Sequence, residues 1–253
     1  MIPHSWIWNR LANKKLDWQN ARPFPYVVID SFLPYNSAAA LADEFPPYED
    51  KRWCVYNNAI ENKKALNDWH AFPPETYQFF TYMCSETAVS ALSTLAGVRL
   101  YPDYGLHGGG WHIHGDGGNL NPHLDYSVHP KLDLQRKLNV ILYLTKDYHE
   151  SWGGRFGLWG RGDNCSAPGA IERVIFPYFN RAVIFDTSQQ SWHGLSEPLR
   201  LPDNIYRKSL AMYYLTDRPP NADLRNRALF APREEQQDDE EVLQLCVARS
   251  KIR

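Results

Sequence analysis

This sequence has few cysteines, no long hydrophobic run and almost no net charge. The cysteines lie far apart and show no C-x-x-C spacing, which favours reduced thiols over a disulfide framework; they are Cys54, Cys84, Cys165 and Cys246. No run approaches the length of a membrane span. The segment from Met1 to Lys15 mixes tryptophan with arginine and lysine and does not predict a signal peptide. We therefore expect a cytoplasmic protein that does not bind a membrane.

The charge balance also limits the kinds of partner. The formal net charge is -2 and the pI is near 6.5, so the chain offers no broad basic surface for nucleic acid. A peptide or a small molecule is the expected partner. With 253 residues, 43% of them hydrophobic, the chain is long enough to bury one full core. No internal repeat or low-complexity segment divides it. We therefore expect a single domain over residues 1–253.

The first part of that domain, about residues 1–104, reads as a strand followed by helices. The segment 26–29 is short and rich in β-branched residues, which predicts a strand. Asn36 or Ser37 is placed to cap a helix that continues to Phe45. A longer helix is predicted from Pro73 to about Leu95, with Gly97 as its stop signal. The aromatic and polar segment 46–72 between these helices lacks clear periodicity. It is expected to be a loop that either closes over a site as a lid or packs its aromatics against the body of the protein.

The sequence pattern of the second part, about residues 105–217, predicts a β-rich core. Strands are predicted over 138–145, 181–186 and 207–215, separated by turn-rich segments, which fits a double-layered antiparallel barrel. Because helices precede the strands, we expect them to pack outside one sheet. In the first of these strands the alternation places an all-aliphatic side towards the core; Asn139, Ile141 and Tyr143 form a mixed side suited to lining a cavity.

The remainder, about residues 218–253, reads as a C-terminal tail. An acidic run at 234–241 precedes several aliphatic residues. Acidic residues suit the N-terminus of a helix, so the run predicts the start of a last helix.

The clearest chemical signal is the pair His123-x-Asp125, with His193 further along the chain. Residues two apart on a strand point to the same side, so a short segment can offer one cation a neutral nitrogen and an anionic oxygen. A second histidine must then come from another strand. Two imidazoles and one carboxylate on one face of a metal are typical of non-haem Fe(II) oxygenases, and they leave other positions open.

Four segments in order resemble the 2-oxoglutarate and Fe(II) dependent dioxygenases, in particular their prolyl-4-hydroxylase-like branch. They are Gly115-x-Gly117-Gly118 with Asn121-Pro122-His123-x-Asp125; Tyr143-Leu144-Thr145-Lys146-Asp147 with Gly153-Gly154-Arg155-Phe156; Ala182-Val183-Ile184-Phe185-Asp186 with Trp192-His193-Gly194 and Pro198; and Arg207-x-Ser209-Leu210. The resemblance covers roughly residues 105–217. It implies a double-stranded β-helix of the jelly-roll, cupin-like kind, mainly β with flanking helices.

The resemblance also implies the cofactors and a site. Fe(II) would bind His123, Asp125 and His193, with 2-oxoglutarate as cosubstrate and O2 as oxidant. Arg207 would bind the far carboxylate of 2-oxoglutarate through its fork of donors. Lys208 is the competing cation, but strand alternation sends it the other way. The other residues expected at the cosubstrate are Tyr143, Ser209, His114 and Asn139; His114 departs from the family, which often has tyrosine there.

The implied reaction is hydroxylation of an unactivated C–H bond with release of succinate and CO2. Asp125 favours hydroxylation over halogenation, because related halogenases replace this carboxylate with a small residue. The resemblance suggests a peptidyl, possibly prolyl, substrate, but the same scaffold serves small metabolites. The residues suggested for the substrate pocket are Trp111, Trp192 and Tyr126.

Three alternatives remain at this stage. His112 and His114 with His107 or His129 form a pattern that suits zinc, since imidazoles two apart on a strand share a face. A barrel that binds metal and 2-oxoglutarate as a sensor would keep the same residues without catalysis. A structural protein with a vestigial site is disfavoured by the intact ligand set.

Overall fold

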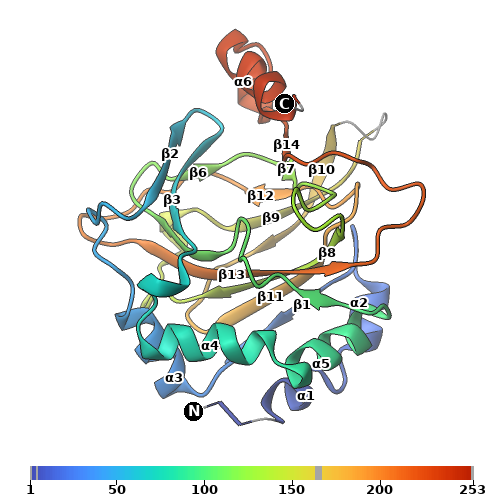
Figure 1. The fold of residues 1–253 in the computed structure, drawn as a ribbon. Helices are drawn as coiled ribbons and strands as arrows, with labels where there is room; N and C mark the ends of the chain where they lie inside the picture. Colours follow the sequence, from blue (N-terminus) through green and yellow to red (C-terminus); the bar gives the residue numbers. More distant parts are fainter. Residues whose placement is uncertain (1, 4, 163–166, 252–253) are drawn as a thin grey trace.

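Two antiparallel sheets, with helices on the outer side of one of them, make up the fold in the computed structural model, which describes residues 2–3, 5–162 and 167–251 (Figure 1). The strands of the major sheet are β1 (Tyr26–Ile29), β2 (Cys54–Asn58), β3 (Glu61–Leu66), β4 (Tyr101–Pro102), β5 (Gly110–His114), β6 (Asn119–Leu120), β8 (Gln135–Tyr143), β11 (Arg181–Asp186) and β13 (Arg207–Thr216). Their order is β1-β11-β8-β13-β5-β3-β2, with β4 paired to β13 and β6 to β3. The minor sheet has β7 (His123–Leu124), β9 (Phe156–Arg161), β10 (Pro168–Ile175), β12 (His193–Leu195) and β14 (Leu229–Phe230), in the order β10-β9-β12-β7-β14.

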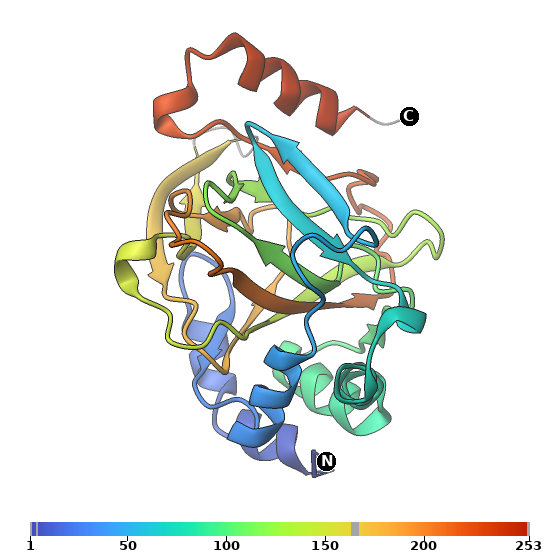
Figure 2. The same ribbon diagram turned by 90° about the vertical axis from the view of Figure 1, so that its left-hand side faces the viewer.

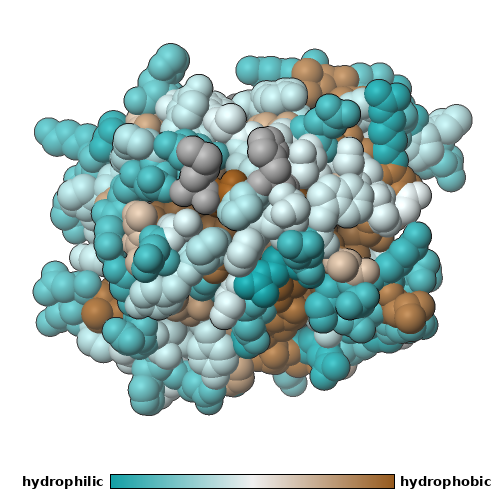
Figure 3. Space-filling model, turned by 90° about the horizontal axis from the view of Figure 1, so that it is seen from below, coloured by the Kyte–Doolittle hydropathy of each residue, from teal (hydrophilic) through white to brown (hydrophobic). Residues whose placement is uncertain are grey.

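Helices from the first part of the chain cover the outer side of the major sheet. They are α1 (Trp6–Leu11), α2 (Lys15–Asn20), α3 (Tyr35–Asp43), α4 (Pro74–Cys84) and α5 (Glu86–Ala96); α6 (Glu240–Ser250) lies apart, and short 3-10 turns occur at Trp69–Ala71, Glu150–Trp152 and Glu234–Gln236. Figure 1 shows α1, α3, α4 and α5 below the sheet. Seen from that side, the surface is mainly polar with scattered hydrophobic patches (Figure 3), so the helices turn their apolar faces inward. The predicted fold class is confirmed.

The side chains of β8 divide between two environments, as the alternation predicts. Leu138, Val140 and Leu142 of β8, and Leu144 just after it, are buried in the core beneath the helices, together with Ile184 of β11 and Leu210 of β13. Asn139 and Ile141 line a cavity on the opposite face. The major sheet therefore has one face that packs in the core and one face that lines the cavity.

The predicted helix from Pro73 to Leu95 is two helices. Ser85 adopts an extended conformation with φ -67° and ψ 153°, which ends α4, and its Oγ accepts a hydrogen bond from the Ala88 N–H at 3.3 Å to cap α5. Serine favours such a position because its hydroxyl replaces a missing helical hydrogen bond. Gly97, in the left-handed region at φ 72°, ends α5 where the stop signal predicts it.

Segment 46–72 is not a plain loop, because it contains the hairpin β2–β3. The hairpin is rich in asparagine and lysine and has little alternation, so its sequence gives no strand signal; it forms by pairing β3 with β5. Its aromatics divide between two roles. Trp53 is buried in the helix-side core, whereas Tyr56 faces the cavity.

The C-terminal tail is also part of the β-structure. Strand β14 pairs with β7 and extends the minor sheet, and α6 follows it on the side opposite the N-terminal helices, above the β2–β3 hairpin (Figure 2). The acidic run does precede a helix, and Asp239 caps it by accepting from the Glu241 and Val242 N–H groups. Cys54, Cys84 and Cys246 are free thiols, and Cys165 lies outside the described residues. Across the described chain, no helix is both long enough and apolar enough to cross a membrane.

Candidate active site

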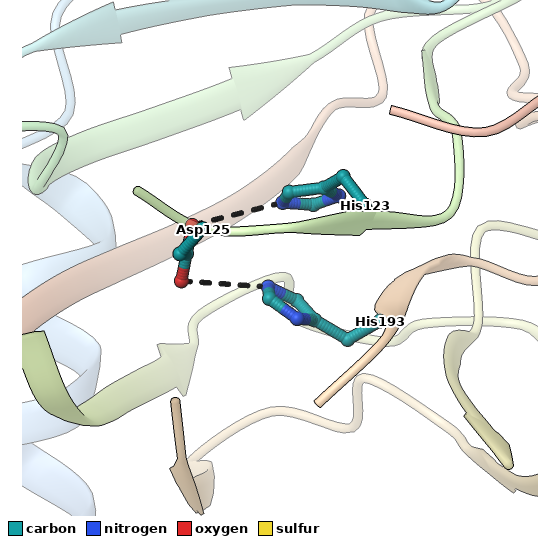
Figure 4. A group of neighbouring side chains, drawn as sticks. All are labelled: His123, Asp125 and His193. Atoms are coloured by element: carbon teal, nitrogen blue, oxygen red, sulfur yellow. Dashed lines mark ion pairs between the residues drawn. The ribbon is translucent and has the colours of Figure 1, made fainter. Parts of the chain in front are cut away.

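Three side chains from two neighbouring strands of the minor sheet converge on one point. His123 on β7 pairs with His193 on β12, and Asp125 follows β7 directly. Asp125 Oδ1 lies 3.8 Å from His123 Nε2, and Asp125 Oδ2 lies 3.6 Å from His193 Nε2. One ligand atom from each residue lies within 4.8 Å of the others. Figure 4 shows both imidazoles and the carboxylate turned towards a common space.

Hydrogen bonds to the backbone set which imidazole nitrogens are free. Nδ1 of His123 lies 2.9 Å from the Asn121 carbonyl oxygen, and Nδ1 of His193 lies 2.8 Å from that of Ser191. A carbonyl oxygen only accepts, so each Nδ1 carries the proton and each Nε2 keeps its lone pair. This arrangement fixes the tautomer that a metal ligand needs.

The charge states suit a divalent cation as well. Burial lowers the pKa of His123 to about 3 and lowers the pKa of His193, so both imidazoles are neutral at pH 7. Burial raises the pKa of Asp125, but the Arg136 guanidinium and the two histidines together outweigh it and hold that pKa well below its usual value. The donor set is therefore two neutral nitrogens and one carboxylate, which fits Fe(II) with positions left open.

The triad lies in a cavity of about 340 Å³ enclosed by both sheets. The major sheet contributes His112, His114, Asn139, Ile141, Arg207 and Ser209; the minor sheet contributes the two ligand histidines, Phe156 and Phe230; the hairpin and α6 contribute Tyr56, Glu61, Lys63 and Arg249. The cavity is large enough for a small cosubstrate beside a metal, at the lower end of the usual range for ligand pockets.

Arg207 is a buried cation that no carboxylate of the described residues pairs with. Its side chain is only 4% exposed; Nε donates to the Gly154 carbonyl at 3.0 Å and the guanidinium lies 4.9 Å from the Tyr143 ring centroid. Gly154 has φ 65°, and a Cβ there would lie 2.2 Å from Leu199 Cδ2, so the turn that presents this carbonyl requires glycine. A buried guanidinium without an acidic partner is costly unless a ligand supplies the negative charge.

Polar atoms of two residues beside Arg207 also lack hydrogen-bond partners: both ring nitrogens of His114 and the Tyr143 hydroxyl. Asn139 Oδ1 lacks a partner as well, but Asn139 lies further along β8, opposite Tyr213 of β13. His114 faces Arg207 in the β5–β13 register, and Tyr143 faces Ser209 in the β8–β13 register. Burial raises the pKa of Tyr143 to about 12 and holds the pKa of His114 well below its usual value, so both are neutral. Such a set of unsatisfied groups around a cation fits a small anion with several oxygens.

Two of the residues predicted for the substrate pocket lie elsewhere. Trp111 is fully buried on the helix side of β5, against Phe45 and Phe72, because strand alternation places it opposite His112 and His114. Trp192 packs behind the minor sheet with Leu124 and Trp159, because its neighbour His193 takes the cavity side. These two predictions are wrong. Tyr126 does line the cavity.

The zinc pattern does not assemble. His112 Nε2 contacts the Gly108 carbonyl oxygen at 3.1 Å, and His107 and His129 pack against each other with ring centroids 5.3 Å apart. Among the described residues, the only group of three or more potential ligands is His123, Asp125 and His193.

Sequence reasoning missed three residues of this site. Arg136 contacts Asp125, Phe230 of β14 stacks on His123 with centroids 5.1 Å apart, and Arg249 of α6 reaches the cavity. Phe230 and Arg249 come from the segment treated as a tail, and no local signal marks them. Arg136 is the second residue of β8 and lies beside a register shift between Tyr214 and Leu215, which brings it to the cavity face against the alternation.

Comparisons with known proteins agree with this geometry. Residues 109–215 match the family model described as the 2OG-Fe(II) oxygenase superfamily, named for the metal and cosubstrate that the sequence predicts. The curated Prolyl 3-hydroxylase OGFOD1 of Xenopus laevis is 35% identical over 88 residues, which cover 34% of this chain but only 17% of that protein. Hence this chain matches about a sixth of its relative's length.

Solved structures share the fold at low identity. A Pseudomonas putida prolyl-4-hydroxylase has a TM-score of 0.57 and 18% identity, covering 83% of this chain and 100% of that chain. A Phytophthora capsici prolyl 4-hydroxylase has a TM-score of 0.56 and 19% identity, covering 99% of this chain and 77% of that chain. The predicted resemblance is confirmed over this segment: residues 109–215 match the model of the 2OG-Fe(II) oxygenase superfamily, and the fold agrees with that of the solved prolyl 4-hydroxylases.

Proposed function

We propose that this chain is a 2-oxoglutarate and Fe(II) dependent dioxygenase that hydroxylates an unactivated C–H bond and releases succinate and CO2. One observation carries the proposal. A two-histidine, one-carboxylate cluster and a buried arginine without an acidic partner line one cavity, next to polar atoms that lack hydrogen bonds. A metal ion would bind the two histidines and the carboxylate, and the dicarboxylate 2-oxoglutarate would supply the negative charge that the buried arginine lacks.

The candidate ligands and the residues near Arg207 then have roles. His123, Asp125 and His193 hold the iron, and Arg207 binds the far carboxylate of 2-oxoglutarate with Tyr143 and Ser209 beside it. His114 and Asn139 supply further polar contacts through their unpartnered atoms. When bound, iron and 2-oxoglutarate activate O2, one oxygen atom passing to succinate and the other to the substrate C–H bond.

The protein's own contribution is orientation and exclusion of water. The backbone carbonyls of Asn121 and Ser191 fix the two imidazoles, so the metal face needs little rearrangement on binding. Phe156 and Phe230 give the cavity apolar walls, which keep water away from reactive species. Tyr126 is the residue of the predicted pocket that is placed to contact a substrate.

For the substrate, we propose a prolyl or other peptidyl residue, or a small metabolite. The Xenopus relative is named as a prolyl 3-hydroxylase, and a Trichoplax adhaerens prolyl hydroxylase was solved with a peptide fragment; its identity to this chain is 15% and its TM-score 0.51, with 84% of this chain and 88% of that one covered. The names of these relatives favour a peptide over a small metabolite as the substrate to test first. A single domain over residues 1–253 and a cytoplasmic location remain predictions from the sequence.

Anaerobic addition of Fe(II) and 2-oxoglutarate tests the metal and cosubstrate sites together. Chelation of iron by the 2-oxo acid should produce a visible metal-to-ligand charge-transfer band. H123A should abolish the band, while H112A, which alters a neighbouring cavity histidine, should retain it. Absence of the band from the folded wild-type protein would refute the proposal, and loss of the band in H112A with retention in H123A would restore the zinc alternative.

Succinate release separates an enzyme from a sensor. In air, a proline-containing peptide library and a set of small metabolites should include compounds that stimulate succinate formation above the uncoupled rate. A protein that shows the charge-transfer band but gives no stimulated succinate with any compound would be a binding module instead.

A further inference from the structure

Arg136 is an arginine buried almost completely next to the triad. Its side chain is 2% exposed, and Nη1 lies 3.1 Å from Asp125 Oδ1. Nη2 donates to the His107 carbonyl oxygen at 2.9 Å. The guanidinium thus has one partner on the carboxylate of the triad and another on the backbone of a different segment.

Two tyrosine rings hold the guanidinium in its plane. Its central carbon lies 3.5 Å from the centroid of Tyr126 and 3.4 Å from that of Tyr213. Contact with both rings, one hydrogen bond and one ion pair leave this planar group very little freedom. The Arg136 guanidinium therefore keeps one position and can fix the position of the groups that it contacts.

The two oxygens of Asp125 are in different situations as a result. Oδ1 is engaged by Arg136, whereas Oδ2 is buried and has no hydrogen-bond partner. Oδ2 lies 3.6 Å from His193 Nε2, whereas Oδ1 lies closer to Arg136, at 3.1 Å, than to His123 Nε2, at 3.8 Å. One oxygen is occupied and the other is left for a ligand.

We propose that Arg136 is a positioning residue: by holding Asp125 through Oδ1, it presents Oδ2 as the only carboxylate atom that binds the metal. The inference rests on the proposed metal site. Binding through a single oxygen keeps one more position of the metal open, which a bidentate 2-oxo acid and O2 both require. The bulge at the start of β8 is the device that brings Arg136 to this place.

Two substitutions distinguish positioning from a simple charge effect. Arg136 is a cation close to the metal position, so repulsion alone predicts tighter metal binding in R136M and unchanged binding in R136K. Positioning predicts weaker binding in both, because lysine keeps the charge but has neither the fork nor the flat stacking surface. We expect the dissociation constant for Co(II) to rise about 10- to 100-fold in R136M, as for other partners of metal ligands.

The experiment is an anaerobic Co(II) titration of the full chain, followed by calorimetry and visible absorption. Freed from Arg136, Asp125 can bind through both oxygens, so the Co(II) ligand-field bands should change in intensity as the coordination number changes. R181M is the matched control, because Arg181 also pairs with an aspartate, Asp30, and lies over a tyrosine ring, Tyr178, away from the cavity. It should bind Co(II) like the wild type, with unchanged bands.

The outcomes separate the inference from the proposed function. If folded R136M and R136K bind Co(II) within twofold of the wild type with the same bands, or if R136M binds more tightly, the positioning role is wrong. Equal losses in R181M would also overturn it, since they would reflect general loosening. If the wild type binds no Co(II), or H123A binds it equally well, the metal site itself is refuted. Should R136M fail to fold, R136K alone decides between positioning and charge.

Discussion

Replacing Arg207 with methionine should separate cosubstrate affinity from protein stability. Arg207 is 4% exposed; among the described residues its guanidinium donates one hydrogen bond, to the Gly154 carbonyl, and pairs with no carboxylate. In the ligand-free protein, its burial is a cost that is only partly offset. In the complex, the same guanidinium would pair with the far carboxylate of 2-oxoglutarate. The substitution therefore acts in opposite directions on the two states.

The magnitude follows from the loss of a buried charged pair. Removing one partner of such a pair costs about 2–5 kcal/mol in binding, and each 1.4 kcal/mol is about a factor of ten, so the dissociation constant should rise roughly 30-fold to several thousand-fold. The free energy of unfolding of the ligand-free protein should stay the same or rise, because the uncompensated charge is gone and methionine fills much of the same volume.

The assay is a titration of 2-oxoglutarate into the anaerobic Fe(II) protein, read from the charge-transfer band, with a denaturant unfolding curve of the ligand-free protein beside it. K208M is the matched control. Lys208 is the next residue on β13, but it points to the helix side, where Nζ donates to the Ala42 carbonyl at 3.1 Å. Its substitution should leave the affinity for 2-oxoglutarate unchanged.

Either of two results would refute this reasoning. If R207M binds 2-oxoglutarate within twofold of the wild type, Arg207 does not hold the carboxylate. Alternatively, K208M could lose as much affinity as R207M, in which case the face assignment on β13 is wrong.

Two further predictions concern stability. Burial lowers the pKa of His123 to about 3, below its unfolded value near 6.5, so as pH falls below 6.5 the unfolded state takes up a proton that the native state does not. Between pH 7.5 and 5.5, the free energy of unfolding of the metal-free protein should therefore fall by roughly 1 kcal/mol from His123 alone. His114 and His193, whose pKa values are also lowered by burial, should add losses of the same sign. Urea unfolding at the two pH values measures this, and equal or greater stability at pH 5.5 would contradict it. W111A should lower the free energy of unfolding by about 3–5 kcal/mol in the same assay, because Trp111 is fully buried in the core. The folded fraction of W111A should still show the charge-transfer band. Loss of the band without loss of folding would indicate that Trp111 contributes to the site.

Residues with a local signal were predictable from the sequence. The strand over residues 181–186 matches β11, and the alternation in β8 correctly separates the core leucines from Asn139 and Ile141. The same rule, applied to β5, would have placed Trp111 away from His112 and His114, so that error was avoidable. The order of the motifs identified the family, because each motif is short and contiguous along the chain.

Other features depend on pairing between distant segments. The β2–β3 hairpin has a polar sequence and becomes a strand pair by joining β5, and β14 becomes a strand by joining β7. In both cases the hydrogen-bond partners lie far away in sequence, and strand formation depends more on such partners than on local propensity.

The sequence by itself predicted that His123, Asp125 and His193 come together as candidate metal ligands, and it predicted which side of β8 faces the cavity. The second prediction succeeds because side-chain alternation is a local property of the backbone. Only the tertiary structure decided how that metal face is supported. A register shift against β13 turns Arg136 towards Asp125, and the returning C-terminal segment stacks Phe230 on His123. Both contacts arise from the registration of one strand against another, and that registration is set by packing over the whole molecule.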